Sequence, residues 1–290
     1  MRLALMVEGQ EGVSWDDWLA LARTCEENGV EALFRSDHYL SPTDPGRAAL
    51  DAWAVIPALA ALTERIELGT LVSPVTFRAA AVLANASKTA HEISGGRISL
   101  GMGTGWMEAE HGAFGFPFPE MKTRVRWLAE QIEAVRGFWG DGHRPRLVVG
   151  GSGLSGTVGP AARWADEYNT VMVTPEECAA RREKLVLACE REGREPISLS
   201  VMTACAIGRD ADEARERIRR RIERTGQTID PDDYKATRGA AAVLGTLEEA
   251  VAQLHRFEEA GVERVMLQHL DHQDLEMVAL IGRELVPLVA

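Results

Sequence analysis

The stretch SGGRISLGMGTGW, at residues 94–106, contains the end of a helix, a strand and a glycine-rich loop, the repeating elements of a parallel α/β fold. Ser94, Gly95 and Gly96 break one helical segment, and the apolar-rich run at 97–102 then predicts a buried strand. Glycines and Trp106 follow directly, where the chain leaves the strand. The stretch therefore predicts a strand that begins after a helix and ends in a glycine-rich loop.

The same order, a strand followed by a helix, repeats on both sides of this stretch. The eight predicted strands lie at residues 3–7, 30–35, 65–72, 97–102, 145–149, 167–173, 197–207 and 262–267. Strict alternation implies a parallel sheet, and eight units favour a closed barrel over an open doubly wound sheet. The chain has 290 residues, and such a barrel commonly needs about 250. We therefore expect a single (β/α)8 barrel domain over residues 1–290.

Two connections are longer than a normal crossover. Residues 103–119, rich in Gly, Phe and Pro, predict a long loop before a helix at 122–139. Residues 208–245 predict an insertion after the seventh strand, which we do not treat as a separate domain. Within it the basic run 215–224 alternates with Glu216 and Glu223, and we interpret this run as a solvated helix face.

Composition excludes several classes of protein. Hydrophobic residues make up 46% of the chain and charged residues 26%, which is typical of a globular protein. The formal net charge of -12 argues against nucleic acid as a partner, and no window approaches the roughly 18 apolar residues of a membrane span. The four cysteines, at positions 25, 178, 189 and 205, form no close pairs, which predicts reduced thiols and a cytoplasmic protein.

Polar residues just after a strand are the candidates for chemistry, because a barrel of this kind builds its active site at the C-terminal ends of its strands. Asp37 and His38 follow the second strand, and the imidazole pKa of about 6.5 suits proton transfer near neutral pH. His38 is thus a candidate general acid or cofactor anchor. In the alternative, Asp37 caps the turn and His38 packs under the loop.

A glycine-rich loop follows the fifth strand and consists of Gly150, Gly151, Ser152 and Gly153. Such a loop before a helix lets backbone N–H groups approach a phosphate, although a plain tight turn has the same composition. Among the histidines, only His269 and His272 are close enough in sequence to suggest a metal clamp, and further ligands are missing. We predict no metal site, which leaves a metal-dependent barrel hydrolase as a weaker alternative.

Five segments together carry a resemblance to a known family over nearly the whole chain. They are SDH at 36–38, LGTLVSP at 68–74, SGGRISLGMGTGW at 94–106, LVVGGSG at 147–153 and ADEYN at 165–169. On these segments the chain resembles the luciferase-like monooxygenase superfamily, and more closely the branch that uses the deazaflavin coenzyme F420.

The resemblance implies a cofactor ring in the barrel mouth, with Asp37 and His38 hydrogen-bonded to its edge near the reactive carbon. His38 is then the best catalytic candidate. The family commonly has a non-prolyl cis peptide beneath the ring, which here falls at Leu71–Val72. The remaining cofactor-binding candidates are Thr70, Leu71, Val72, Gly103, Thr104, Gly105, Gly150, Gly151, Ser152 and Gly153. The candidates for the substrate pocket are Glu8, Trp106, His111 and Gln268.

The function implied is hydride transfer between F420 and a small organic substrate. Sugar-phosphate dehydrogenases of this branch have a Glu directly after Gly-Thr-Gly, whereas this chain has Trp106, so an apolar or aromatic substrate is favoured. The apolar residues of this region, which can equally form a packed lid, are Met102, Trp106, Met107, Phe114 and Phe116. FMN is the alternative cofactor, in a luciferase-like monooxygenase, and a cofactor-binding protein without turnover is a further alternative.

We also predict a homodimer. The helices predicted at 51–63 and 79–93 are rich in Ala, Leu and Val on more than one face, as an interface requires. The family resemblance has the same implication.

Overall fold

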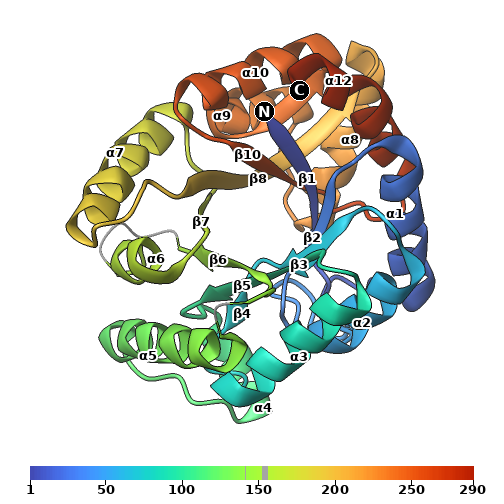
Figure 1. The fold of residues 1–290 in the computed structure, drawn as a ribbon. Coiled ribbons are helices and arrows are strands. Elements are labelled where there is room, and N and C mark those ends of the chain that lie inside the picture. The colour runs from blue at the N-terminus through green and yellow to red at the C-terminus, as the bar shows by residue number, and fades with distance from the viewer. Residues whose placement is uncertain (141, 152–155) are drawn as a thin grey trace.

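Eight parallel strands close into a barrel in the computed structural model, which describes residues 1–140, 142–151 and 156–290 (Figure 1). The ladder runs β10-β1-β2-β3-β5-β6-β7-β8, and β10 pairs in turn with β8, which closes the ring. The barrel strands are β1 (Arg2–Val7), β2 (Ala32–Arg35), β3 (Glu67–Thr70), β5 (Ile98–Gly103), β6 (Arg146–Gly150), β7 (Glu167–Val171), β8 (Ser198–Gly208) and β10 (Arg264–Gln268). The predicted (β/α)8 barrel is confirmed.

Helices surround the ring and bury its outer face (Figure 1). They are α1 (Trp15–Asn28), α2 (Ala52–Leu62), α3 (Ala80–Ile93), α5 (Met121–Trp139), α6 (Val158–Trp164), α7 (Pro175–Arg191), α10 (Leu247–Glu259), α11 (Leu275–Leu280) and α12 (Val286–Val289), with a π-helical turn (Ile281–Leu285) between the last two. Ser14, Thr174 and Thr246 begin α1, α7 and α10 with reciprocal capping boxes, which satisfy free N–H groups of the first turn. No helix in the described part of the chain is long and apolar enough to cross a membrane.

Side chains of the strands alternate between two cores because successive residues of a strand point to opposite faces. Leu3 and Leu5 of β1 pack outward against the helices, whereas Ala4 and Met6 point into the barrel. Phe34 of β2 joins the inner cluster. The barrel interior is therefore filled with side chains below the mouth, and the mouth alone is free to form a site.

The connection after β5 differs from the predicted long loop, because residues 108–114 form a helix, α4 (Glu108–Phe114). Glu108, Ala109 and Glu110 favour a helix, and Gly115 ends it in the left-handed conformation with φ 70°. A short strand, β4 (Ser73–Pro74), pairs with β5 after the non-prolyl cis peptide at Leu71–Val72. The cis peptide lies where the family resemblance placed it.

The predicted insertion after the seventh barrel strand contains four elements. They are α8 (Ala211–Arg224), α9 (Pro231–Arg238), a 3-10 turn (Gly239–Ala241) and β9 (Val243–Thr246). Strand β8 extends beyond the barrel and pairs there with β9, and α8 packs against both strands. Ile218 and Ile222 of α8 bury against Tyr234 of α9 in a small separate core.

The interpretation of the basic run 215–224 as a solvated face is wrong for part of α8. Arg217 and Arg221 are buried, whereas Arg219 and Arg220 are about half exposed and pair with Glu216. The reason is that α8 lies across the end of β8, so one side of the helix faces protein and the other faces water.

Candidate functional site

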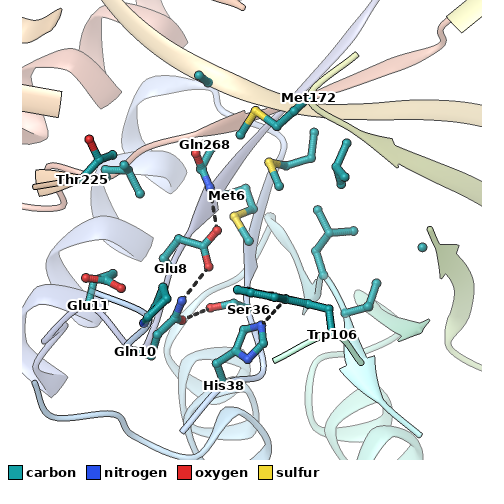
Figure 2. Close-up of a pocket in the computed structure, with 18 of the residues that line it drawn as sticks. Met6, Glu8, Gln10, Glu11, Ser36, His38, Trp106, Met172, Thr225 and Gln268 are labelled. Carbon is teal, nitrogen blue, oxygen red and sulfur yellow. Dashed lines mark hydrogen bonds between the residues drawn. The ribbon is translucent and has the colours of Figure 1, made fainter. Parts of the chain in front are cut away.

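A cavity of about 710 Å³ opens at the C-terminal ends of the barrel strands. Figure 2 shows the side chains of Glu8, His38, Trp106 and Gln268 around it, from segments far apart in the sequence. The predicted site residues that line it are Glu8, His38, Leu71, Val72, Gly103, Thr104, Gly105, Trp106, Gly150, Gly151 and Gln268. The structure thus gathers most of the predicted residues in one place.

His38 has both ring nitrogens engaged. Its Nδ1 lies 2.7 Å from Oε2 of Glu110, and the indole Nε1 of Trp106 donates to its Nε2 across 3.2 Å (Figure 2). Burial lowers the pKa of His38, but the hydrogen bond to Glu110 and the charge of that carboxylate outweigh burial, so the net shift of the pKa is upward. The imidazole is therefore held in a fixed orientation with a proton acceptor on one side.

Glu110 of α4 is fully buried beneath His38. Its second oxygen, Oε1, accepts hydrogen bonds from the backbone N–H groups of Tyr39 and Leu40 at 2.5 and 3.2 Å. Both oxygens of the carboxylate are thus satisfied by donors. A carboxylate can only accept hydrogen bonds. In the contact between Glu110 and His38 the proton therefore lies on Nδ1 of His38.

Glu8, at the end of β1, belongs to a chain of hydrogen bonds along the cavity wall (Figure 2). Its carboxylate accepts from Nε2 of Gln268 at 2.6 Å and from Nε2 of Gln10 at 3.1 Å. Ser36 donates to Oε1 of Gln10 at 2.6 Å and accepts from the N–H of Gly9 at 2.9 Å. Two amide donors therefore orient the Glu8 carboxylate.

The insertion contributes positive charge to the cavity lining. Arg221, 5% exposed, donates to the backbone and side-chain oxygens of Gln268 and lies 3.4 Å from the hydroxyl of Tyr234. Within the described residues it forms no ion pair with a carboxylate. Arg238, at the end of α9, also lines the cavity and is exposed, with no hydrogen bond or ion pair to any described residue. Arg224 lines the cavity as well but pairs with Asp271 at 3.0 Å.

The rest of the cavity wall is mostly apolar. Met6, Met172 and Met202 line it together with Leu71 and Val72 of the cis peptide. Figure 2 shows the side chain of Met172 on the side of the cavity away from His38. These flexible, polarizable side chains suit an irregular apolar ligand.

Val72 explains two of the glycines that line the cavity. A Cβ added at Gly103 would lie 2.4 Å from Cγ2 of Val72, and one added at Gly150 would lie 2.7 Å from its Cγ1. No real Cβ contact is that short, so the β5 and β6 strands need glycine where Val72 packs against them.

Asn169 of β7 supplies a polar atom on the same wall. Its Nδ2 donates to Oγ of Ser200 at 2.9 Å, which fixes the amide orientation, and its Oδ1 has no hydrogen-bond partner. Buried acceptors are normally satisfied. A ligand N–H in the cavity is therefore a fitting partner for this oxygen.

Asp37 does not line the cavity, in contrast to its predicted place at the cofactor. Its Oδ2 lies 2.6 Å from Nη1 of Arg78 and accepts from the hydroxyl of Ser73 at 2.6 Å. Arg78 also donates to Asp51 and to the hydroxyl of Tyr39, each at 2.6 Å. The side chain of Asp37 therefore points behind the strand end, opposite to that of His38.

Thr70 and His111 are also outside the cavity lining. The Thr70 hydroxyl bonds within the sheet, to the carbonyl oxygen of Gly101. His111 lies 2.7 Å from both the hydroxyl of Thr76 and the carbonyl oxygen of Met107, which satisfies its two ring nitrogens.

The aromatic residues after β5 form a packed cluster instead of a substrate surface. Phe116 stacks on Phe77 with ring centroids 4.5 Å apart, and Phe114 packs on Tyr39 at 5.5 Å. His111 joins the same cluster beside Phe118. Met102 and Met107 are buried, so Trp106 alone of the five apolar residues named for this region lines the cavity.

The predicted phosphate loop is only partly supported by geometry. Ser152 and Gly153 lie outside the described residues, and the N–H of Gly151 already donates to the carbonyl oxygen of Asn169 at 3.1 Å. A Cβ on Gly151 would lie 2.2 Å from Oγ1 of Thr157, so a bulky residue there would collide with the protein itself. Gly151 is thus unsuited to donate its N–H to a phosphate.

Sequence reasoning missed Glu110, Asn169 and the arginines of the insertion. Glu110 lies 72 positions from His38 in a segment that was expected to be a loop, so no spacing signal joins the two. Arg221 lies within residues 215–224, whose alternating charges are typical of a solvent-exposed helix. Among the described residues, no group of three or more His, Cys, Asp or Glu side chains is arranged to hold a metal ion.

Comparison with known proteins places this barrel in a family. The family model described as luciferase-like monooxygenase matches residues 2–284. The chain belongs to the luciferase-like monooxygenase family. An F420-dependent glucose-6-phosphate dehydrogenase of Amycolatopsis mediterranei is 38% identical over 124 residues, which are 42% of this chain and 37% of that protein. The chain therefore matches little more than a third of that relative's length.

Other proteins match over all or nearly all of the chain at lower identity. A 5,10-methylenetetrahydromethanopterin reductase of Methanolobus tindarius is 24% identical over 97% of this chain and 100% of that protein. A monooxygenase of Streptomyces bottropensis superposes with a TM-score of 0.83, at 21% identity and full coverage of both chains. An F420-dependent secondary alcohol dehydrogenase has a TM-score of 0.80 at 18% identity, covering 100% of this chain and 99% of that one. These two structures share the barrel fold.

Proposed function

We propose that this protein is an oxidoreductase that transfers hydride between the deazaflavin coenzyme F420 and a small organic substrate. Membership of the luciferase-like family supports a redox enzyme, and several relatives are named for F420. The observation that carries the proposal is the placement of His38, whose tautomer is set by Glu110, in the cavity at the barrel mouth.

The cavity residues fit a flat ring that is apolar on its face and polar at its edge. Leu71, Val72 and Met6 offer an apolar surface, and the unpartnered Oδ1 of Asn169 offers an acceptor for a ring N–H. When bound, the deazaflavin would supply the carbon that accepts or donates hydride. The protein supplies binding, orientation and proton transfer.

His38 is the group best placed to move a proton. With Nδ1 protonated toward Glu110, the lone pair of Nε2 faces the cavity side, where it can take a proton from a substrate hydroxyl. Once charged, Nε2 can return a proton to a carbonyl oxygen in the reverse direction. Glu8, held by two amide donors, is a second carboxylate within the same cavity and stabilises a positive imidazole.

The substrate we propose combines an apolar part with a hydrogen-bond acceptor or an anionic group. Trp106 and the three methionines provide apolar contact, in keeping with the expectation from sequence. Arg221 and Arg238 have no carboxylate partner among the described residues, so an anionic group at this wall would meet two uncompensated cations. Charge-assisted hydrogen bonds of this kind are the strong ones.

Titration of the purified protein with F420 and with FMN tests the cofactor. We expect F420 to bind at least ~10-fold more tightly than FMN, a difference of about 1.4 kcal/mol. Fluorescence of each cofactor reports its binding directly. Tighter binding of FMN, with oxygen consumed during turnover, would favour a luciferase-like monooxygenase instead.

The two remaining alternative functions predict different experimental results. F420 binding without hydride transfer to any of a panel of small alcohols and ketones would favour a cofactor-binding protein without turnover. Activity that needs a stoichiometric metal, detected by elemental analysis, would favour a barrel hydrolase.

Replacing Arg238 by alanine tests the substrate wall. Because Arg238 is exposed and has no partner among the described residues, its loss should leave the melting temperature unchanged. For a substrate that carries a carboxylate we expect KM to rise roughly tenfold, as for one lost hydrogen bond to a charged group, with kcat little changed. Arg126→Ala, at an exposed position on α5, is the control. A KM for the acidic substrate in Arg238→Ala that equals the value in the wild type and in Arg126→Ala would contradict the assignment.

Further features remain proposals. We propose a homodimer through the side of the barrel where α2, α3 and α5 pack side by side (Figure 1). The exposed apolar residues of these helices are Leu62, Val82, Ile93 and Phe138. We also keep as proposals a single domain over residues 1–290, a cytoplasmic location, partners limited to small molecules, and cofactor contacts by Gly150, Ser152 and Gly153.

A further inference from the structure

Trp106 stands out in the cavity because it is a large aromatic residue that is 62% exposed yet makes a specific hydrogen bond. Its indole N–H points at Nε2 of His38, and the two rings meet edge to face, with centroids 5.6 Å apart and an interplanar angle of 74°. Figure 2 shows the indole extended across the cavity above the imidazole. The indole therefore covers the one nitrogen of His38 that faces the cavity.

The hydrogen bond from Trp106 is possible in only one protonation state of His38. An indole N–H can only donate, so Nε2 must carry a lone pair. Glu110 can only accept, which fixes the single proton of the neutral ring on Nδ1. When Nε2 gains a proton, two N–H groups face one another and the contact with Trp106 is lost.

The surrounding charges favour that second state. Glu110 contacts the ring from α4, Glu8 faces it from β1, and Asp37 precedes it at the end of β2, with its charge paired to Arg78. Against burial, which lowers the pKa of His38, these carboxylates raise it. The hydrogen bond from Trp106 opposes them, because it stabilises the neutral ring.

The backbone next to Trp106 is held, whereas the indole itself is largely exposed to solvent. Arg124 donates to the carbonyl oxygen of Gly105 at 2.5 Å and fixes the loop just before Trp106. The exposed indole can therefore leave His38 by rotation of its side chain alone.

We propose that Trp106 is a displaceable cap on Nε2 of His38, that Glu110 sets the tautomer which the cap requires, and that the cap opens when Nε2 is protonated or meets a substrate hydroxyl. Glu110 is thus a positioning residue that acts through His38. The role of the cap in turnover rests on the proposed function, but the cap itself is a property of the protein without cofactor.

The test is a pH titration of the cofactor-free protein followed by NMR of the indole N–H groups and the histidine rings. Loss of one resonance in Trp106→Phe assigns the Trp106 indole. We expect this resonance to move toward the position of a free, solvated indole as the pH falls, with the same midpoint as the His38 ring. Melting curves confirm that each variant is folded.

Two variants give opposite shifts of the His38 midpoint. Trp106→Phe removes a bond to the neutral ring, so the midpoint should rise by about half a unit to one unit. Glu110→Gln removes the negative charge and presents an amide donor to Nδ1, so the midpoint should fall by at least about one unit and the indole should be free at every pH. Glu110→Asp, which keeps the charge, should restore the higher midpoint.

Two results would contradict the proposal that Trp106 caps His38. One is an indole resonance of Trp106 that does not change while His38 titrates, and the other is an unchanged His38 midpoint in Trp106→Phe. Because Trp106 is exposed, its replacement is compatible with folding even if the buried Glu110 variants fail to fold. Neither measurement needs cofactor or substrate, so failure of the proposed function leaves this test standing.

Discussion

Replacing His38 by alanine is expected to lower turnover by at least ~10²-fold, within the range of about 10²- to 10⁴-fold for a positioned acid or base. The reason is that Nε2 of His38 is the cavity-side nitrogen of an imidazole whose other nitrogen is bound to Glu110. Part of the cofactor affinity should remain, because the apolar wall at Leu71 and Val72 is untouched. The fold should also remain, since Glu110 keeps its two backbone donors.

A single-turnover rate at saturating cofactor, measured with a substrate that the wild-type protein converts, checks this expectation. Melting curves measured alongside separate a loss of chemistry from a loss of folded protein. His255→Ala is a matched control, because His255 is an exposed histidine on α10 outside the cavity lining. A normal rate per folded, cofactor-loaded molecule in His38→Ala would end the catalytic assignment.

The barrel was predictable from the sequence because each strand and helix carries its own local signal. The runs at 3–7 and 97–102 are short and apolar, and the helices α1 and α7 begin at the capping residues Ser14 and Thr174. Eight repeats of this local pattern leave few ways to arrange a parallel sheet. The strand order, closed by β8 and β10, then follows from the fold class.

Only those site residues were predictable whose place follows from their position at the end of a strand. Glu8, His38 and Gln268 lie at or just after the ends of strands, and the barrel brings such residues to one mouth. The direction of a side chain is a different matter, as the neighbours Asp37 and His38 show. Both residues follow β2, yet His38 faces the cavity and Asp37 faces Arg78.

Contacts between distant segments were beyond the reach of sequence patterns. Glu110 meets His38 because α4 folds back over the end of β2, and Arg221 enters the cavity because β8 continues beyond the barrel. Both depend on the path of an insertion. The glycines at 103 and 150 have a similar cause, since their close neighbour is Val72 and no property of the local sequence reveals it.

Asp37→Asn is expected to destabilise the protein by about 2–3 kcal/mol, the range for a lost bond between charged groups in a buried setting. Asp37 is 1% exposed and Arg78 is largely buried, so water cannot replace the missing charge. The value stays below that of a fully isolated buried charge because Asp51 still pairs with Arg78. The free energy of unfolding, from denaturant titration at neutral pH, measures the change.

Asp232→Asn provides the control for this substitution. Arg215 pairs with both Asp230 and Asp232, as Arg78 pairs with both Asp51 and Asp37, but Asp232 is 76% exposed. An exposed ion pair contributes little to stability because water screens it, so the control should change the free energy of unfolding far less. The same two variants distinguish a structural role of Asp37 from a direct contact with the cofactor. If Asp37 only positions the strand end, the folded Asp37→Asn protein should bind cofactor with nearly unchanged affinity. A large loss of cofactor affinity at conditions where Asp37→Asn is fully folded would instead return Asp37 to the cofactor site.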